Sequence, residues 1–68
     1  MNYRINQRIE VTETKCEGVI KAGERGTVVD VKPNPQGFGT DLAILFDRDE
    51  HPMTLNAESW AGSLRESV

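Results

Sequence analysis

The sequence has a single cysteine and a single histidine among its 68 residues. Cys16 alone cannot form an internal disulfide, and His51 alone cannot complete a zinc site of cysteine and histidine ligands. We therefore expect a protein of a reducing compartment with no bound metal. One histidine also offers little for nucleophilic catalysis, because a serine or cysteine nucleophile needs a base within hydrogen-bond reach.

Basic residues are also few. Eight Lys and Arg face eleven Asp and Glu, which gives a net charge of −3. The chain as a whole therefore has no positive field that would attract nucleic acid. A local basic face would have to be gathered from Arg4, Arg8, Lys21, Arg25 and Lys32.

Long apolar runs are missing as well. The longest surrounds residues 42–46, which is far short of a membrane span. The chain does not open on a charged segment followed by an apolar one, the pattern of a secretory signal. We expect no membrane association and a cytoplasmic protein.

The small size of the chain limits what it can do. Residues 1–68 predict one domain, because a chain of this length buries only ~60% of the surface that its unfolded form exposes. Little room remains for a water-excluded active site. No nucleophile elbow or phosphate-binding glycine loop followed by a helix is present. We therefore expect neither an enzyme nor a bound cofactor.

Alternating apolar residues predict several short strands. Residues 8–14 place Ile9 and Val11 on one side, and residues 26–32 are rich in β-branched side chains. In residues 41–46 the large apolar side chains alternate, so we expect a central strand there. Residues 53–55 predict a return strand, and residues 62–66 a brief last one.

The remaining segments predict loops and one turn of helix. Residues 15–25 predict a long excursion that Val19 and Ile20 fold onto the core. Residues 33–40 combine two prolines with two glycines and predict a connecting loop. Asn56 is typical of a helix cap, so we expect a single helical turn near Ala57–Trp60, with Trp60 in the core.

Five short antiparallel strands with one short helical turn predict an all-β fold, a small, strongly bent barrel. The segment from Ala22 to Val31, with Gly23 and Gly26 three residues apart, resembles the glycine–spacer–glycine–valine segment of KOW-type and related SH3-like barrels. This resemblance implies an SH3-like barrel from about Arg8 to Leu64. It implies no single function, because such barrels occur in ribosomal proteins, transcription factors, enzyme subunits and adaptors.

Phe38 is the most prominent candidate for contact with a partner. It lies between Gly37 and Gly39 in the proline-bearing loop, where an aromatic side chain is either presented to a partner or folded over the core as a lid. Asp47, Asp49, Glu50 and His51 place four potential metal ligands in five residues, but their spacing matches no EF-hand or zinc site, and a solvated turn is the better interpretation.

Two functions remain open. The first is a non-enzymatic protein-interaction module, which could be a small adaptor, a regulatory subunit or an inhibitor. It would use the loop around Phe38 and the segment from Thr14 to Gly23, both longer than ordinary hairpin turns. The second is a KOW-like RNA-binding module with a basic face built from Arg25 and Lys32, together with Arg4 and Arg8. The two differ in salt dependence, which is steep for RNA. The sequence leaves the oligomeric state undetermined.

Overall fold

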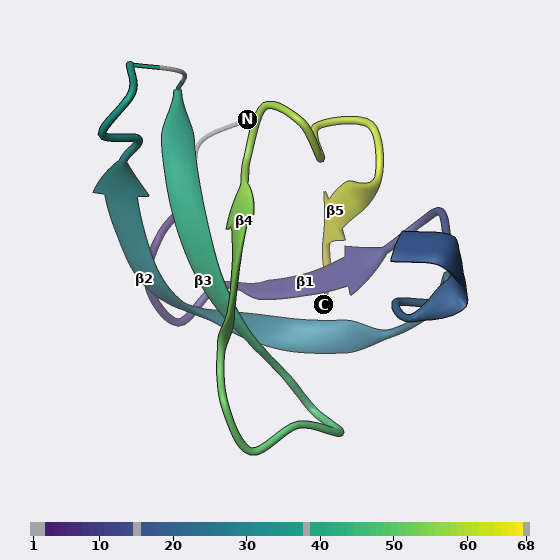
Figure 1. Ribbon diagram of the computed structural model, residues 1–68. Coiled ribbons are helices and arrows are strands. Elements are labelled where there is room, and N and C mark those ends of the chain that lie inside the picture. The colour runs from purple at the N-terminus through teal and green to yellow at the C-terminus, as the bar shows by residue number, and fades with distance from the viewer. Residues whose placement is uncertain (1–2, 15, 38, 68) are drawn as a thin grey trace.

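The computed structural model describes residues 3–14, 16–37 and 39–67 as one antiparallel sheet of five strands (Figure 1). The strands are β1 (Arg8–Val11), β2 (Arg25–Pro33), β3 (Thr40–Phe46), β4 (Met53–Asn56) and β5 (Leu64–Glu66). Their order across the sheet is β4-β3-β2-β1-β5. The predicted all-β class and all five predicted strands are confirmed, with bounds that differ by a few residues. Within the described residues no helix is long and apolar enough to cross a membrane.

Strand β2 joins the two halves of the sheet. Its first residues pair with β1, and nearly its whole length pairs with β3. The register with β3 shifts between Val28 and Asp30, which marks a bulge at Val29. Figure 1 shows β2 bending from one half of the sheet into the other. Strands β4 and β5 are its two edges, so the pairing of the described strands does not close a barrel.

The core lies on the inner face of this bent sheet. Residues of β3 alternate strictly, with Leu42, Ile44 and Phe46 buried and their neighbours half-exposed. This is the period-two pattern that the sequence predicts. The buried apolar cluster comprises Ile9, Val11, Ile20, Val28, Leu42, Ile44, Phe46, Leu55, Ala57 and Leu64, with Tyr3, Val31, Met53 and Trp60 packed against it.

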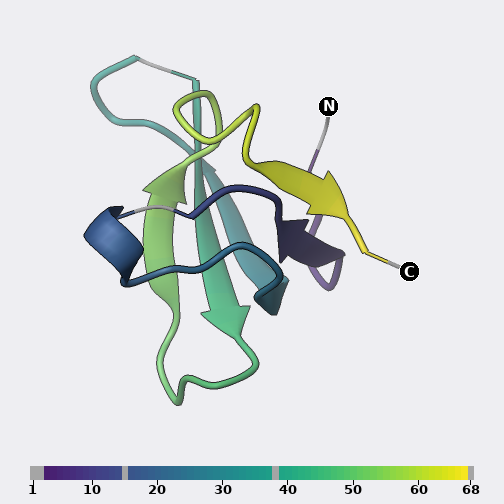
Figure 2. The ribbon, with the colours of Figure 1, turned by 90° about the vertical axis from the view of Figure 1, so that its right-hand side faces the viewer.

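The long segment between β1 and β2 is part of the core. Gly23 and Glu24 pair with Val11 through backbone hydrogen bonds, which close the base of this excursion. In Figure 2 the segment lies in front of the sheet. Ile20 is fully buried in the core, whereas Val19 is 57% exposed, so the expectation that both fold inward is confirmed for Ile20 and wrong for Val19.

The helical content differs from the prediction. A 3-10 turn, η1 (Cys16–Gly18), lies in the excursion, where the sequence predicts only a loop. The backbone of this turn has positive φ angles at Glu17 and Gly18. Its sequence has no apolar periodicity from which a helical turn could be predicted.

The prediction of a helical turn at Ala57–Trp60 is wrong, because residues 57–63 form a series of hydrogen-bonded turns and not a helix. Asn56 still accepts a hydrogen bond from the N–H of Ser59 on its side chain (3.0 Å) and one from Trp60 on its carbonyl (3.2 Å). The next backbone bonds, from Ala61 to Glu58 and from Ser63 to Trp60, span three residues, so the helix does not propagate.

Candidate interaction surface

The loop between β2 and β3 is organised by Asn34. Its side-chain oxygen accepts the N–H of Gln36 (2.8 Å), and its carbonyl accepts that of Gly37 (3.0 Å). Its own N–H donates to Gly39, and its side-chain amide donates to Asp41 Oδ1 (2.9 Å). Phe38, the candidate contact residue of this loop, lies outside the described residues. The loop that carries it is therefore braced on both sides of Phe38 by one asparagine.

A second brace joins this loop to the turns after β4. Glu58 Oε2 accepts the backbone N–H of Thr40 at 2.9 Å. The Glu58 carboxylate lies directly over Gly39, where a built Cβ would come within 1.9 Å of that oxygen. Tyr3 lies beside it, and burial together with the nearby Glu58 charge raises the pKa of the Tyr3 hydroxyl. Gly39 therefore has a packing role that the sequence pattern does not show.

An open groove of about 230 Å³ lies on the solvent-facing side of β2, β3 and β4, next to this loop. Pro33 and Pro35 lie at its loop end, and Ala43 and Thr54 come from β3 and β4. Charged side chains complete the lining, together with the edge of a buried leucine: Asp30, Lys32, Asp41 and Leu42. We call this depression the outer groove. Its volume is below the ~300–1,000 Å³ of typical small-molecule pockets, so it suits one protruding side chain better than a cofactor.

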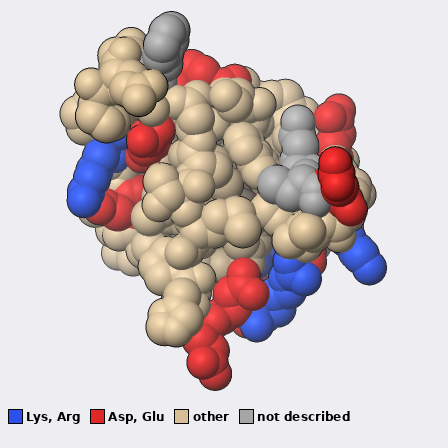
Figure 3. Space-filling view, viewed as in Figure 1, with Lys and Arg blue, Asp and Glu red and all other residues tan. Residues whose placement is uncertain are grey.

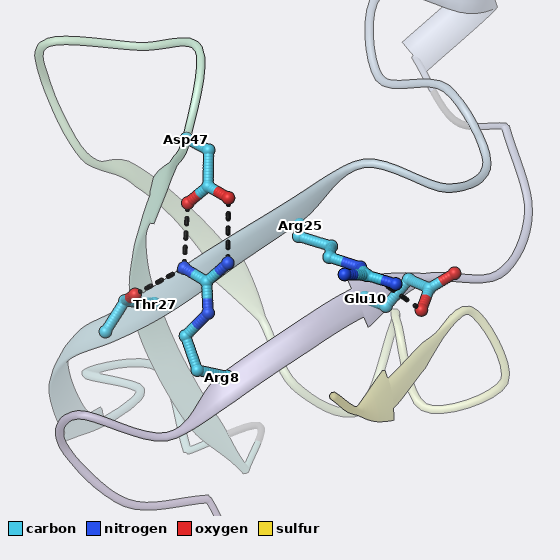
Figure 4. Close-up of polar contacts among 5 residues, drawn as sticks. All are labelled: Arg8, Glu10, Arg25, Thr27 and Asp47. Atoms are coloured by element: carbon cyan, nitrogen blue, oxygen red, sulfur yellow. Dashed lines mark hydrogen bonds and ion pairs between the residues drawn. The ribbon is translucent and has the colours of Figure 1, made fainter. Parts of the chain in front are cut away.

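The opposite half of the sheet carries an arginine network (Figure 4). Arg8 donates two hydrogen bonds of 2.7 Å to the two oxygens of Asp47, and a third to the Thr27 hydroxyl. Glu10 Oε1 lies 3.7 Å from Arg25 Nε and 3.1 Å from Arg65 Nη2. Glu10 is the cross-strand neighbour of both arginines, so the three side chains form one row on the outer face.

A further contact holds the β1–β2 excursion to the turn after β3. Arg48 Nε lies 3.2 Å from Glu24 Oε1, and Arg48 Nη2 donates to the carbonyl of Val19. The other oxygen of Glu24 is buried without a hydrogen-bond partner in the described part of the chain. The excursion is thus held in place by the buried Ile20 side chain and by the contacts of Glu24 and Val19 with Arg48.

The sequence-predicted site residues do not form one site. Lys21 is in the β1–β2 excursion, whereas Arg25 begins β2 and Lys32 lies near its end. The excursion and the 34–39 loop leave opposite ends of β2, as Figure 1 shows. Gly37 and Gly39 flank Phe38 in that loop with φ angles of 83° and 69°. Only Lys32 of the predicted cations lines the outer groove.

Positive charge is largely neutralised within the molecule. All five arginines and Lys32 form ion pairs with carboxylates, and Lys21 is the only described cation without one. On the face shown in Figure 3, acidic and basic groups lie at the margins and adjoin each other, and no continuous basic stripe crosses the face. The four potential ligands at residues 47–51 belong to no metal-binding group, since none occurs among the residues that the structure describes.

Sequence reasoning missed three residues of these sites. The sequence pattern places Asp41 at the start of a strand, Glu10 on the polar side of the strand at residues 8–14, and Arg65 in the brief last strand, with no binding or pairing role for any of them. A signal existed for Glu10, because its outward position on β1 faces a cross-strand neighbour on each side. Those neighbours become identifiable only when the register is known.

Searches of protein-family models, curated proteins and solved structures found no match to this chain. The function is therefore inferred from the loop, the outer groove and the charge pairs.

Proposed function

We propose that this chain is a non-enzymatic protein-interaction module that binds a partner protein at the outer groove and the adjoining 34–39 loop. The observation that carries this proposal is the position of the groove. It lies on an outer sheet face built from three strands, next to a loop that Asn34 and Glu58 hold in place. Binding residues on a braced loop beside a rigid sheet need little ordering when a partner docks.

We further propose an SH3-like barrel with a KOW-like segment at Ala22–Val31. Three features support it: the order of five antiparallel strands, the bend of β2, and the bulge at Val29. Gly26 supports it as well, since it lies where β2 passes closely over β3. Such a fold carries no function by itself, and the interaction site is argued from the groove.

The proposal is tested by site-specific crosslinking. A photoreactive amino acid replaces Thr54, an exposed residue at the groove, or Glu50, an exposed residue in the turn after β3. We expect a discrete protein adduct from position 54 that survives nuclease treatment, and none of the same mass from position 50. Ala43→Arg, which puts a long side chain on the groove floor, should abolish that adduct. Equal adducts from both positions, or none from position 54, would reject the proposal.

One observation favours RNA binding as a second candidate. Arg8, Arg25 and Arg65 share the outer face of three neighbouring strands, as a nucleic-acid face would require. These arginines already form ion pairs with Asp47 and Glu10, and the pairing lowers the attraction of the arginines for phosphate. RNA binding at this face predicts a steep fall in affinity with salt. For a single-stranded RNA, Arg25→Ala with Arg65→Ala should reduce the slope of log affinity against log salt concentration by about 1.4. Electrophoretic mobility shifts on a single-stranded RNA across a salt series measure this slope.

A further inference from the structure

The outer groove contains a carboxylate that forms no ion pair with the described part of the chain. Asp30 is paired with Lys32, whose Nζ lies 3.2 Å from it. Asp41 is the cross-strand neighbour of the same lysine, but it forms no ion pair with any described residue. Its Oδ1 accepts the side-chain amides of Asn34 (2.9 Å) and Asn56 (3.4 Å), which orient the carboxylate without neutralising it. With two carboxylates and one ammonium among its lining residues, the groove carries a net negative charge.

The other walls of the groove suit the stem of a long basic side chain. Pro33, Pro35 and Ala43 supply apolar surface beside the Asp41 carboxylate. Arginine and lysine lay their methylene groups along apolar surface and keep the charged end near polar groups. The volume of about 230 Å³ suits one such side chain.

The charge of the rest of the chain also favours a basic partner over an acidic one. The net charge is −3, and the five arginines and Lys32 are already paired, so an acidic segment would meet repulsion at the groove. We propose that the groove receives an arginine or lysine side chain from the partner protein. This inference rests on the proposed function and specifies the chemistry of the partner.

The test uses three blocked heptapeptides that differ only in the central residue, which lies between two valines and is arginine, its uncharged isostere citrulline, or glutamate. Each is titrated into the ¹⁵N-labelled protein and followed by amide chemical shifts. We expect the arginine peptide to shift the amides of Asp41, Ala43 and Thr54 with millimolar affinity. The citrulline peptide should bind about fivefold more weakly, the upper end for a partly exposed ion pair.

Two variants of equal charge complete the experiment. Asp41→Asn keeps an oxygen acceptor for the Asn34 amide and should remove the preference for arginine over citrulline. Glu50→Gln makes the same change of net charge in the turn after β3 and should preserve that preference.

Equal affinity for arginine and citrulline in the wild type, or binding of the glutamate peptide in the groove, would overturn the inference. Arginine binding that Asp41→Asn leaves unchanged would overturn it too. The proposed function has its own readout, because crosslinking from position 54 does not depend on the charge of the partner.

Discussion

Arg8 of β1 and Asp47, the residue after β3, form a bidentate ion pair with both N–O distances at 2.7 Å. The guanidinium also donates to Thr27 of β2 at 2.9 Å, so one side chain links three strands (Figure 4). The planar fork of arginine matches the two carboxylate oxygens, a geometry that lysine cannot reproduce. This contact joins positions 39 residues apart, and it crosses the line where the two halves of the sheet meet at β2.

This pair makes the stability depend on pH. The hydrogen bond from Arg8 holds the pKa of Asp47 below its usual value, so the folded state binds a proton less readily than the unfolded state. The stabilisation is present above the unfolded pKa of about 3.9 and is lost as the pH falls through the folded pKa. We expect Asp47→Asn to lower the urea midpoint at pH 7 by a small amount, and we expect this difference to shrink as the pH is lowered below the unfolded pKa.

Salt provides the control for this measurement. Both side chains are about half exposed, at 41% for Arg8 and 57% for Asp47, so 1 M salt should shrink the difference at pH 7. A difference of the same size at pH 7 and pH 2.5 would contradict an electrostatic origin.

Gly26 permits the close approach of β2 to β3. A Cβ at this position would lie 2.8 Å from Ile44 Cγ2 and 2.9 Å from the carbonyl oxygen of Leu45. The backbone of β3 cannot move aside without disturbing the core. We therefore expect Gly26→Ala to lower the free energy of unfolding by about 1–3 kcal/mol, the usual range for overpacking.

Gly62 is the matched control for this substitution. A Cβ there would meet nothing within 4 Å, so Gly62→Ala should change the free energy of unfolding by no more than about 0.5 kcal/mol. Urea denaturation of both variants measures the contrast. Equal values for the two would show that the approach at Gly26 is not tight.

The strands could be predicted from the sequence because their signals are local. Alternation placed Leu42, Ile44 and Phe46 on the buried face, and β-branched residues marked β2. The bulge at Val29 could not be predicted, since it depends on how β2 registers against β3. The same holds for η1, whose backbone has left-handed residues and no apolar period.

Less of the candidate site could be predicted from the sequence. The loop of residues 33–40 was recognised from its prolines and glycines. The groove beside it combines residues from β2, β3 and β4. Thr54 lines the groove because it pairs with Ala43 across β3 and β4, a register that the sequence alone does not give. Likewise, Glu58 reaches Thr40 across 18 residues, a contact that no local pattern encodes.

Ile20 anchors the excursion between β1 and β2. Its side chain is fully buried, while that of its neighbour Val19 is 57% exposed. Truncation of a buried isoleucine leaves a cavity, so Ile20→Ala should cost about 2–5 kcal/mol of unfolding free energy. Val19→Ala should cost no more than about 0.5 kcal/mol, as is usual for an exposed site.

Amide hydrogen exchange adds a local readout to these two variants. Loss of the anchor should speed exchange at Gly23, whose N–H donates to the carbonyl of Val11 at the base of the excursion. If Val19→Ala and Ile20→Ala were equally mild, the excursion would not be held by the core.

Gly39 and Glu58 are coupled through direct contact. Gly39 has a φ of 69°, and a Cβ would overlap the Glu58 carboxylate that accepts the N–H of Thr40. Gly39→Ala therefore carries two costs: about 1–2 kcal/mol for a left-handed non-glycine residue, and displacement of the Glu58 brace. Gly37→Ala shares the first cost but not the second, because a Cβ at Gly37 meets nothing within 4 Å.

A double-mutant cycle separates the two costs. In a Glu58→Ala background the Thr40 brace is already absent, so Gly39→Ala should cost about as much there as Gly37→Ala does in the wild type. The coupling free energy between positions 39 and 58, measured by urea denaturation, should be about 1 kcal/mol, the net value of one hydrogen bond. A coupling near zero would mean that Glu58 moves aside and re-forms its bond elsewhere.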